Sequence, residues 1–318
     1  QSLNTRNGQW MSMSNNHKYF EGFHIPQIIL PWYTEDPVEW DNILVKQKIM
    51  APKTFMNEVM GVSDSQGTRI VTLDDLKSSC TNAVKMNYAE HLGTKINQNT
   101  FRSFLNGYVH RVAGIDWSGG GRGAKMEDGS YQQVSRTCVS ILGIRSDGIA
   151  DLLAHKIFTP DQTQPEAVRD IIKLCSAYNV QLIGADAGEG SLGNGFLKEH
   201  FGLHKIIPFR YSGTSGAHAK WNKESGCYVL NKTSILDNVL MLFRRRKIRF
   251  SSYEECKPIF DDILAEFEET TKSGEKRWTH SSRTPDDSLH SIAFAFCVYR
   301  AAMGNLDLQY SEEFLKNI

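Results

Sequence analysis

Three short apolar runs in the middle of the chain constrain its fold more than any other feature. They span residues 108–116, 137–144 and 151–158, and polar or glycine-rich segments separate them. Apolar runs of this length, bounded by turn residues, are typical of buried strands. Three such strands in succession predict an antiparallel meander.

Helices and strands alternate after this meander. Thr163 and Glu166 have the spacing of a helix capping box, and an apolar stripe at helical spacing follows them. We expect strands at residues 180–185 and 205–209, helices at 195–200, 233–245 and 253–266, a hairpin or loop at 268–284, and a final helix from Asp286 onward. The pattern predicts an α/β fold with a mixed central sheet flanked by helices.

Residues 1–104 follow a different pattern. The first 17 residues are polar, and two prolines interrupt the apolar segment 20–32. Short helices are expected at residues 37–49, after Pro52, and after Thr72, which has Asp75 at capping-box spacing. We therefore expect an irregular, mostly helical N-terminal arm (1–104), an α/β domain (105–304) and a C-terminal tail (305–318).

Composition excludes some classes of protein. Lys+Arg and Asp+Glu both number 36, so any basic surface for a nucleic acid must be local. The six cysteines are widely spaced and form no C-x-x-C, so we expect neither a zinc site nor a disulfide framework. The same spacing indicates a protein of a reducing compartment. No run of 18 apolar residues occurs, and no membrane span is expected.

Aspartates stand where the expected elements begin or end. Asp116 and Asp186 each end an apolar run, and Asp286 and Asp287 open the final helix. Two strand ends and a helix start can meet above one edge of a sheet. Carboxylates brought together repel unless cations neutralise them, and Mg²⁺ or Mn²⁺ suits an all-oxygen site. Two such ions serve phosphodiester cleavage.

Each of these residues also has a purely structural interpretation. Asp116 precedes glycines and suits a turn, and Asp286 suits a helix N-cap. Asp287 and His290 are three residues apart and share a helix face, which favours Asp287 over Asp286 as a ligand. His290 is expected either to support the acids without being a ligand or to be a hydrogen-bonded core histidine.

The segment Gly188-Glu189-Gly190-Ser191-Leu192-Gly193 has the spacing of a dinucleotide-binding fingerprint. Asp186 and Glu189 would place negative charge beside a pyrophosphate. Rossmann glycines also normally follow the first strand of their unit, whereas here three expected strands come before that point. Arg210 stands about where a 2′-phosphate would be bound, so an NADP-binding Rossmann enzyme stays an alternative.

The order of the three acids is that of an RNase H-like site, and several motifs identify a family. The chain resembles the C-terminal nuclease domain of the large terminase subunit of tailed bacteriophages. The resemblance rests on residues 113–117, 182–186, 233–250 and 285–295, and on residues 22–27 and 53–61, which look like the stretch joining the family's ATPase motor to its nuclease.

This resemblance implies a metal-dependent endonuclease that cuts double-stranded viral DNA during genome packaging. It implies Asp116, Asp186 and Asp287 as catalytic metal ligands for two Mg²⁺ or Mn²⁺ ions, with Asp286 as a further metal candidate. His290 stands where related chains often carry another acid, so the ligand set stays open. The family's partners are the small terminase subunit and the portal protein, in the cytoplasm of the infected bacterium.

Two further expectations concern nucleotides and DNA. The chain lacks a G-x-x-x-x-G-K-[ST] loop, so the motor's ATP site is expected upstream of Gln1. A transposase, a junction resolvase and a non-catalytic docking module remain alternative functions. Residues expected to contact DNA phosphates are Arg122, Lys125, Arg210, Lys220, Arg244, Arg245 and Arg246, although the last three also suit the C-terminal end of a helix.

Overall fold

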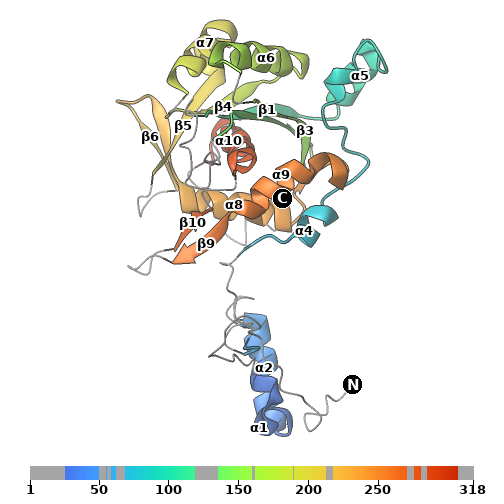
Figure 1. The fold of residues 1–318 in the computed structure, drawn as a ribbon, viewed down its shortest axis with the longest axis vertical. Coiled ribbons are helices and arrows are strands. Elements are labelled where there is room, and N and C mark those ends of the chain that lie inside the picture. Colours follow the sequence, from blue (N-terminus) through green and yellow to red (C-terminus); the bar gives the residue numbers. More distant parts are fainter. Residues whose placement is uncertain are drawn as a thin grey trace, which may run out of the picture. The chain divides into compact units, whose positions relative to one another are not determined.

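A computed structural model describes residues 26–49, 55, 59–61, 69–118, 135–159, 162–188, 190–212, 218–270, 276–280 and 285–306. The chain forms two compact units, residues 1–68 and 69–318 (Figure 1). The first contains η2 (Gln27–Ile29), α1 (Pro31–Thr34) and α2 (Pro37–Ile49). Helix α2 confirms one prediction. The loop expected at residues 1–17 lies outside the described residues, as does most of the segment after Pro52.

The second unit is built on an eight-stranded sheet with strand order β6-β7-β5-β4-β1-β2-β3-β8 in its described part. Strands β1 (His110–Asp116), β2 (Cys138–Ile144) and β3 (Ala150–Ile157) are antiparallel neighbours, which confirms the meander. Strand β4 (Leu182–Asp186) runs parallel to β1, and β5 (Ile206–Ser212) runs parallel to β4. A central first strand with the second aspartate on its parallel neighbour confirms the RNase H-like α/β prediction.

The remaining strands were not predicted. Strands β6 (Ala219–Asn222) and β7 (Cys227–Asn231) form a hairpin beside β5, and β8 (Ile248–Arg249) pairs with β3 at the other edge. These strands are only two to five residues long. Residues of β6 and β7 are also largely exposed or half-buried. Strand β6 carries no continuous apolar run, and the run in β7 covers only the four residues 227–230, the shortest length that indicates a buried strand.

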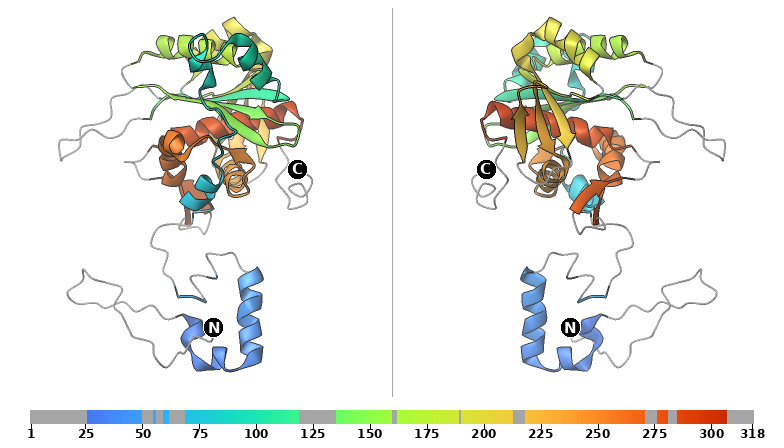
Figure 2. Two further views of the ribbon diagram at one scale, coloured as in Figure 1. Left: turned by 90° about the vertical axis from the view of Figure 1, so that its right-hand side faces the viewer. Right: turned by 90° about the vertical axis from the view of Figure 1, so that its left-hand side faces the viewer.

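Helices cover both faces of the sheet (Figure 2). Helices α6 (Gln164–Ala177) and α7 (Ser191–Phe201) lie on one face, and α8 (Lys232–Arg244), α9 (Tyr253–Ala265) and α10 (Asp287–Ala302) lie on the other. The sheet separates two hydrophobic cores: on β1, Val112 belongs to the core with α10, whereas Ala113 and Ile115 belong to the core with α6. The capping box of Thr163 and Glu166 at α6 is present as predicted.

The region expected to be a hairpin or loop at 268–284 contains a hairpin. Strands β9 (Phe267–Thr270) and β10 (Lys276–Thr279) pair antiparallel. Helix α7 begins four residues before the expected start at residue 195, and α10 begins at Asp287 with Asp286 as its N-cap. Residues 307–318, most of the expected tail, lie outside the described part.

The second compact unit begins at Arg69, whereas the change in sequence pattern predicts an α/β domain from residue 105. This segment contains α4 (Leu73–Ser78), η3 (Tyr88–His91) and α5 (Gln98–Leu105), and Thr72 and Asp75 form the predicted capping box. Leu76 is fully buried in the core with α10. The buried residues of this segment are spaced irregularly, so no helical or strand period marks them as part of the domain.

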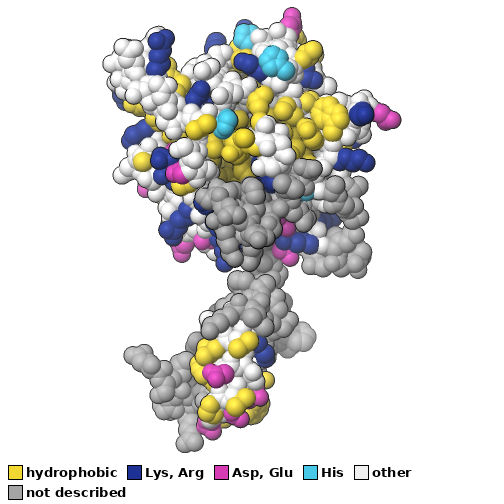
Figure 3. All heavy atoms as spheres, turned by 180° about the vertical axis from the view of Figure 1, so that it is seen from behind, with side chains coloured by type: hydrophobic (Ala, Val, Ile, Leu, Met, Phe, Trp, Pro, Cys, Tyr) yellow, Lys and Arg dark blue, Asp and Glu magenta, His cyan; other side chains and the backbone are white. Residues whose placement is uncertain are grey.

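The surface of this unit mixes hydrophobic and charged groups. On the face shown in Figure 3, hydrophobic side chains gather near the middle, whereas Lys and Arg side chains are spread around the periphery. Among the helices described, none combines the length and the apolar character needed to cross a membrane.

Candidate metal centre

Two aspartates lie side by side where β1 and β4 end. These strands are parallel neighbours, and Ile115 pairs with Ala185, so the next residue on each strand is an aspartate, Asp116 and Asp186. Side chains alternate between the faces of a strand, so both carboxylates are on the face that also presents Gly114 and Gly184. That face is the one covered by α10.

Helix α10 reaches the two aspartates because glycines let it lie unusually close to the sheet. Gly114 and Gly184 are paired in register. A Cβ on Gly114 would collide with the backbone of Ser291 and Ala295, and a Cβ on Gly184 would lie 2.5 Å from the carbonyl oxygen of Phe294. Only glycine permits this approach. It brings the first residues of α10 to the carboxyl ends of β1 and β4.

The acids form one electrostatic cluster around Asp116. Burial raises the pKa of Asp116 well above its ordinary value, and the charge of His290 opposes this shift. The carboxylates of Asp287, Asp186 and Asp286 raise the pKa further, because each disfavours another negative charge nearby. The structure thus brings together all four acids that the sequence singled out.

Asp287 is held by two donors from the segment before β2. Ser135 Oγ donates to Asp287 Oδ1 at 2.7 Å, and Arg136 Nε donates to Oδ2 at 3.2 Å. Arg136 also bonds Asp262 of α9, whose carboxylate accepts the backbone N–H of Ser288. The Asp287 side chain is almost fully buried.

Asp286 has entirely different partners. Its Oδ2 lies 2.7 Å from His290 Nε2, 3.0 Å from His280 Nδ1 and 3.8 Å from Lys232 Nζ. Glu266 shares these cations, with Oε1 3.0 Å from Lys232 Nζ and 3.5 Å from His280 Nδ1. We call Lys232, Glu266, His280, Asp286 and His290 the ion cluster.

Charge pairing sets the protonation of the ion cluster. Burial would raise the pKa of Asp286, but the charge of His290 and hydrogen bonds from both histidines outweigh it and hold this pKa far below its usual range. At Glu266, hydrogen bonds from His280 and His290 and the charge of Lys232 likewise outweigh burial, and the pKa falls to about 2. Hydrogen bonds to Asp286 and Glu266 raise the pKa of His280 to about 10. The pKa of His290 rises to about 9, since Asp286 outweighs burial.

The ion cluster offers three potential metal-binding atoms, from Glu266, His280 and Asp286, all within 4.8 Å of one another. Lys232 and the two protonated histidines already supply the positive charge that these carboxylates need. An added cation would have to displace them. Asp116, Asp186 and Asp287 carry only carboxylate oxygens, the kind of ligand that Mg²⁺ and Mn²⁺ prefer, and their role as metal ligands stays a prediction.

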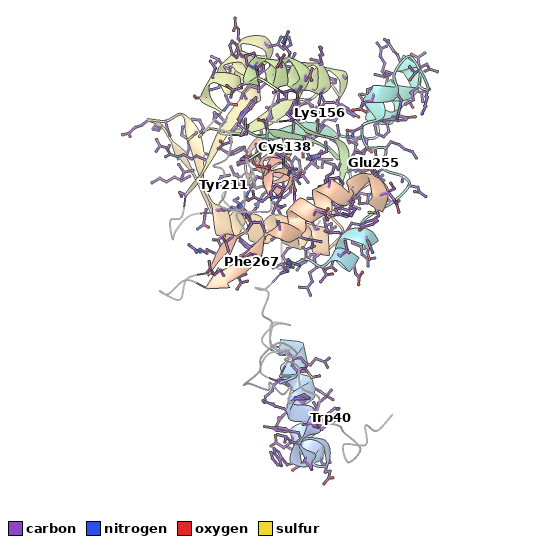
Figure 4. All side chains as sticks on the ribbon, viewed as in Figure 1. Trp40, Cys138, Lys156, Tyr211, Glu255 and Phe267 are labelled. Carbon is purple, nitrogen blue, oxygen red and sulfur yellow. The ribbon has the colours of Figure 1, made fainter. Side chains whose placement is uncertain are left out.

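Tyr211, labelled in Figure 4, lies beside α10 at the end of β5. Its hydroxyl is 3.1 Å from His290 Nδ1, and its ring stacks on Phe294. His290 is thus engaged on both ring nitrogens, by Tyr211 and by Asp286. That His290 supports the acids without being a ligand stays a prediction.

The glycine fingerprint after β4 is explained by packing. A Cβ on Gly190 or Gly193 would collide with the indole ring of Trp117. Trp117 Nε1 donates to Asn194 Oδ1 at 3.0 Å, and Asn194 Nδ2 donates to the carbonyl oxygen of Asp186 at 2.7 Å. The glycines therefore make room for Trp117, which ties the residues after Asp116 to the end of β4.

The predicted DNA-contacting residues fall into three groups. Arg122 and Lys125 lie outside the described residues. Arg210 and Lys220 are exposed and share one row across the sheet, because both pair with Val229 of β7. Asp186 pairs with Phe209, and Arg210 is the next residue. This row therefore lies at the same edge of the sheet as the acids, but its side chains are on the opposite face.

The basic run Arg244-Arg245-Arg246 is remote from the ion cluster. It is exposed at the C-terminal end of α8, whereas Lys232 of the cluster opens that helix. Twelve residues of helix separate Lys232 from Arg244, roughly 18 Å along the axis. These arginines can stabilise the C-terminal end of α8 through the helix dipole without contacting the ion cluster.

Six residues around the acids were missed from the sequence. Ser135, Arg136 and Asp262 contact Asp287 or each other across more than 100 residues of chain, and no local pattern marks them. The proximity of Glu266 and His280 could have been predicted, because they flank the hairpin β9–β10 and a hairpin brings its two ends together. Lys232 begins α8, and no such pattern marks it.

Comparisons with known proteins point to one kind of solved structure. No protein-family model and no curated protein matches the chain. Similar solved structures include the large terminase nuclease from thermophilic phage G20c (16% identity, 59% of this chain and 81% of that chain, TM-score 0.40). Another is the nuclease domain of the bacteriophage SPP1 large terminase with bound Mn (11% identity, 67% of this chain and 95% of that chain, TM-score 0.38). A third is the nuclease domain of the large terminase subunit gp2 of bacterial virus Sf6 (10% identity, 72% of this chain and 98% of that chain, TM-score 0.45).

These proteins belong to the family that the sequence motifs resemble. All three TM-scores lie below 0.5, so the function of this chain has to be argued from its own residues.

Proposed function

We propose that this chain is a metal-dependent endonuclease that cuts double-stranded viral DNA during genome packaging, as the nuclease part of a large terminase subunit. The observation that carries the proposal is the meeting of Asp116, Asp186 and Asp287 from β1, β4 and α10 at one edge of the sheet. Carboxylates gathered in this way need cations to offset their repulsion.

Asp116, Asp186 and Asp287 would hold two Mg²⁺ or Mn²⁺ ions. Such ions supply an activated water and stabilise the leaving 3′-oxygen of the phosphodiester. The donor set fits them, because it consists of carboxylate oxygens only. Asp287 is proposed over Asp286, because Asp286 is neutralised inside the ion cluster by His280 and His290.

The chain's own residues would orient the site and the substrate. Trp117 and Asn194 hold the end of β4 against β1, and the ion cluster fixes the start of α10. The exposed row of Arg210 and Lys220 lies on the face of the sheet opposite the acids. It is proposed to contact phosphates of the duplex where the DNA extends past this edge of the sheet, without reading its sequence.

The wider assembly follows from the same proposal. The N-terminal arm, residues 1–104, would belong to the end of the family's motor region. The small terminase subunit and the portal protein would be partners in the cytoplasm of the infected bacterium. Cleavage would then be one step of packaging.

Cleavage of a supercoiled plasmid in the presence of Mn²⁺ tests the proposal. Asp116→Asn, Asp186→Ala and Asp287→Asn should each reduce the rate by more than about 100-fold, the upper range for losing even a residue that only supports a ligand. Asp286→Asn should retain more activity than Asp287→Asn, because its contacts are with the ion cluster. The matched control is Asp261→Asn, an exposed residue of α9 paired with Lys257, which should cut like the unmodified chain.

Folding of each variant is checked by circular dichroism. A folded Asp186→Ala variant that still cuts the plasmid in Mn²⁺ would contradict the proposed nuclease function. A four-way junction and a linear duplex of the same sequence are compared in parallel. Preference for the junction would favour a junction resolvase over a packaging nuclease.

A further inference from the structure

Among the described residues, Arg136 is a cation that contacts Asp287 and has no role in the proposed cleavage so far. It precedes β2, and its side chain is 19% exposed. Nε donates to Asp287 Oδ2 at 3.2 Å, and Nη2 donates to Asp262 Oδ2 at 2.6 Å. One guanidinium thus bridges two carboxylates from α10 and α9. A planar group with several fixed donors can do this, whereas a lysine ammonium is a single point charge.

Asp262 fixes the other side of this bridge. Its side chain is 2% exposed, and the same oxygen that binds Arg136 accepts the backbone N–H of Ser288 at 3.1 Å. Ser288 directly follows Asp287 in the first turn of α10. Asp262 therefore holds Arg136 and the backbone beside Asp287 at the same time, so their relative positions are set by one carboxylate.

The donors on Asp287 orient its carboxylate without closing it to a metal. Ser135 Oγ binds Oδ1 at 2.7 Å, and Arg136 Nε binds Oδ2. Each carboxylate oxygen has two lone pairs, so one hydrogen bond to each oxygen leaves the other lone pair available. Two hydrogen bonds from two residues also fix the rotation of the group.

We propose that Arg136 is a positioning residue for the metal site: it fixes the carboxylate of Asp287 in the orientation that binds the divalent ion, and Asp262 fixes Arg136. The inference rests on the proposed function, because it assumes that Asp287 is a metal ligand. It adds to the site a residue from the segment that precedes β2, outside the three elements from which the acids come.

Two other roles for Arg136 predict different results. A DNA-contacting arginine would change the KM for DNA and its salt dependence, and would leave metal binding unchanged. An arginine that only stabilises the fold would lower the denaturation midpoint and leave metal binding by the folded protein unchanged. Metal affinity therefore separates positioning from both.

The experiment is a calorimetric titration of the full chain with Mn²⁺ in the absence of DNA. Arg136→Gln should weaken Mn²⁺ binding by about 10–100-fold, the usual loss when a residue supporting a metal ligand is replaced. Arg136→Lys should also weaken it, because a lysine ammonium lacks the planar set of fixed donors that holds both carboxylates in defined directions. Asp262→Asn should shift the affinity in the same direction, and the Arg136→Gln/Asp262→Asn double variant should bind about as weakly as Arg136→Gln alone.

The chain offers a matched control in Arg249 and Asp151. This pair is joined by hydrogen bonds of 2.7 and 2.9 Å, with side chains 22% and 1% exposed, against 19% and 2% for Arg136 and Asp262. Arg249→Gln should lower stability to a similar extent and bind Mn²⁺ as the unmodified chain does. This control separates loss of a buried ion pair from loss of positioning.

Mn²⁺ affinity of folded Arg136→Gln equal to that of the unmodified chain would overturn the inference, as would an equal weakening by Arg249→Gln. If Arg136→Gln fails to fold, Arg136→Lys and Asp262→Asn provide the same comparison. Failure of the unmodified chain to bind Mn²⁺ and to cut DNA would refute the proposed function itself. Binding and cutting by the unmodified chain with no effect at Arg136 would refute only the positioning role.

Discussion

Single glycines decide how closely the parts of the site approach one another. Gly114 and Gly184 admit the backbone of α10 against β1 and β4, and Gly190 admits the ring of Trp117 beside the end of β4. At each position the neighbour is backbone or a large ring, which cannot move aside at little cost. Their role is space and not an unusual backbone conformation, since Gly190 has φ −91°.

Gly190→Ala is expected to destabilise the second unit. The new Cβ would meet the indole of Trp117 and would lie 2.5 Å from the carbonyl oxygen of Asp186. Overpacking of this kind costs about 1–3 kcal/mol, and the displaced strand end should also weaken Mn²⁺-dependent cleavage. Urea unfolding followed by circular dichroism measures the loss.

Gly195→Ala serves as its control, in the helix α7 that Gly190 caps. Nothing lies within 4 Å of a Cβ built on Gly195, which is exposed within α7. Replacing a glycine in a helix by alanine should stabilise by roughly 0.5–1 kcal/mol. Equal effects of the two substitutions would contradict the packing role assigned to Gly190.

Residues differ in how far sequence reasoning can find them. Asp116 and Asp186 were found because each ends an apolar run, and the strand end is visible in the sequence alone. Arg136 was not found, because its two partners are 126 and 151 residues away and its neighbours have no period. Pairing across such separations is set by the packing of α9 and α10 on the sheet.

At the level of elements, the hairpin β9–β10 links α8 to the start of α10. Trp278 Nε1 donates to Asp237 of α8 at 2.7 Å, and Lys276 Nζ lies 2.9 Å from the same residue. Glu266 precedes the hairpin and His280 follows it, and both contact the cations and acids of the ion cluster. Ordering the hairpin therefore helps to fix Asp286.

The ion cluster should make stability depend on pH in the alkaline range. His280 and His290 have folded pKa values of about 10 and about 9, raised from 6.5. Both states bind the protons below pH 6.5, where the stabilisation is complete, and it is lost as the pH rises through 9 and 10. Urea unfolding midpoints in EDTA should therefore fall between pH 6.5 and pH 10.

His280→Asn is the test of this assignment. The variant should be less stable at pH 6.5 and should lose less on going to pH 10, because one of the two titrating groups is absent. The same slope in the variant and the unmodified chain would rule out His280 as a source. On the acid side, Glu266 contributes above pH 4.5 and loses its contribution as the pH falls towards 2.

Elements with long apolar patterns were predicted, and short ones were not. The meander, α6, α8, α9 and α10 all carry several buried residues in a row or at helical spacing. The edge hairpin β6–β7 exposes Trp221 and Lys220 and depends on pairing with β5. Such strands are formed by their neighbours more than by their own composition.

At the scale of the whole molecule, the two compact units divide the chain at residue 68. Residues 69–104 look like part of an arm in the sequence, but several of them are built into the second unit. Thr81 N donates to Phe250 O at 2.9 Å, and Asn87 Oδ1 accepts the backbone N–H of His155 at 3.0 Å. The segment is thus hydrogen-bonded both to Phe250, which lies between β8 and α9, and to β3.

Truncation should reveal this division directly. A chain of residues 69–318 should fold and keep its Mn²⁺ binding, whereas a chain of residues 105–318 should fail to fold. Leu76 and Phe101 are buried in the two separate cores, and each buried side chain of this size contributes about 1.5–3 kcal/mol. Removing these two together with Met86, Val84 and the hydrogen bonds of Asn87 approaches the roughly 5–15 kcal/mol that stabilise a typical domain. Thermal unfolding followed by circular dichroism tests this prediction. A cooperative transition in the shorter chain would show that the α/β domain folds from residue 105 onward. Loss of the transition in the longer chain would show that residues 1–68 are needed for folding.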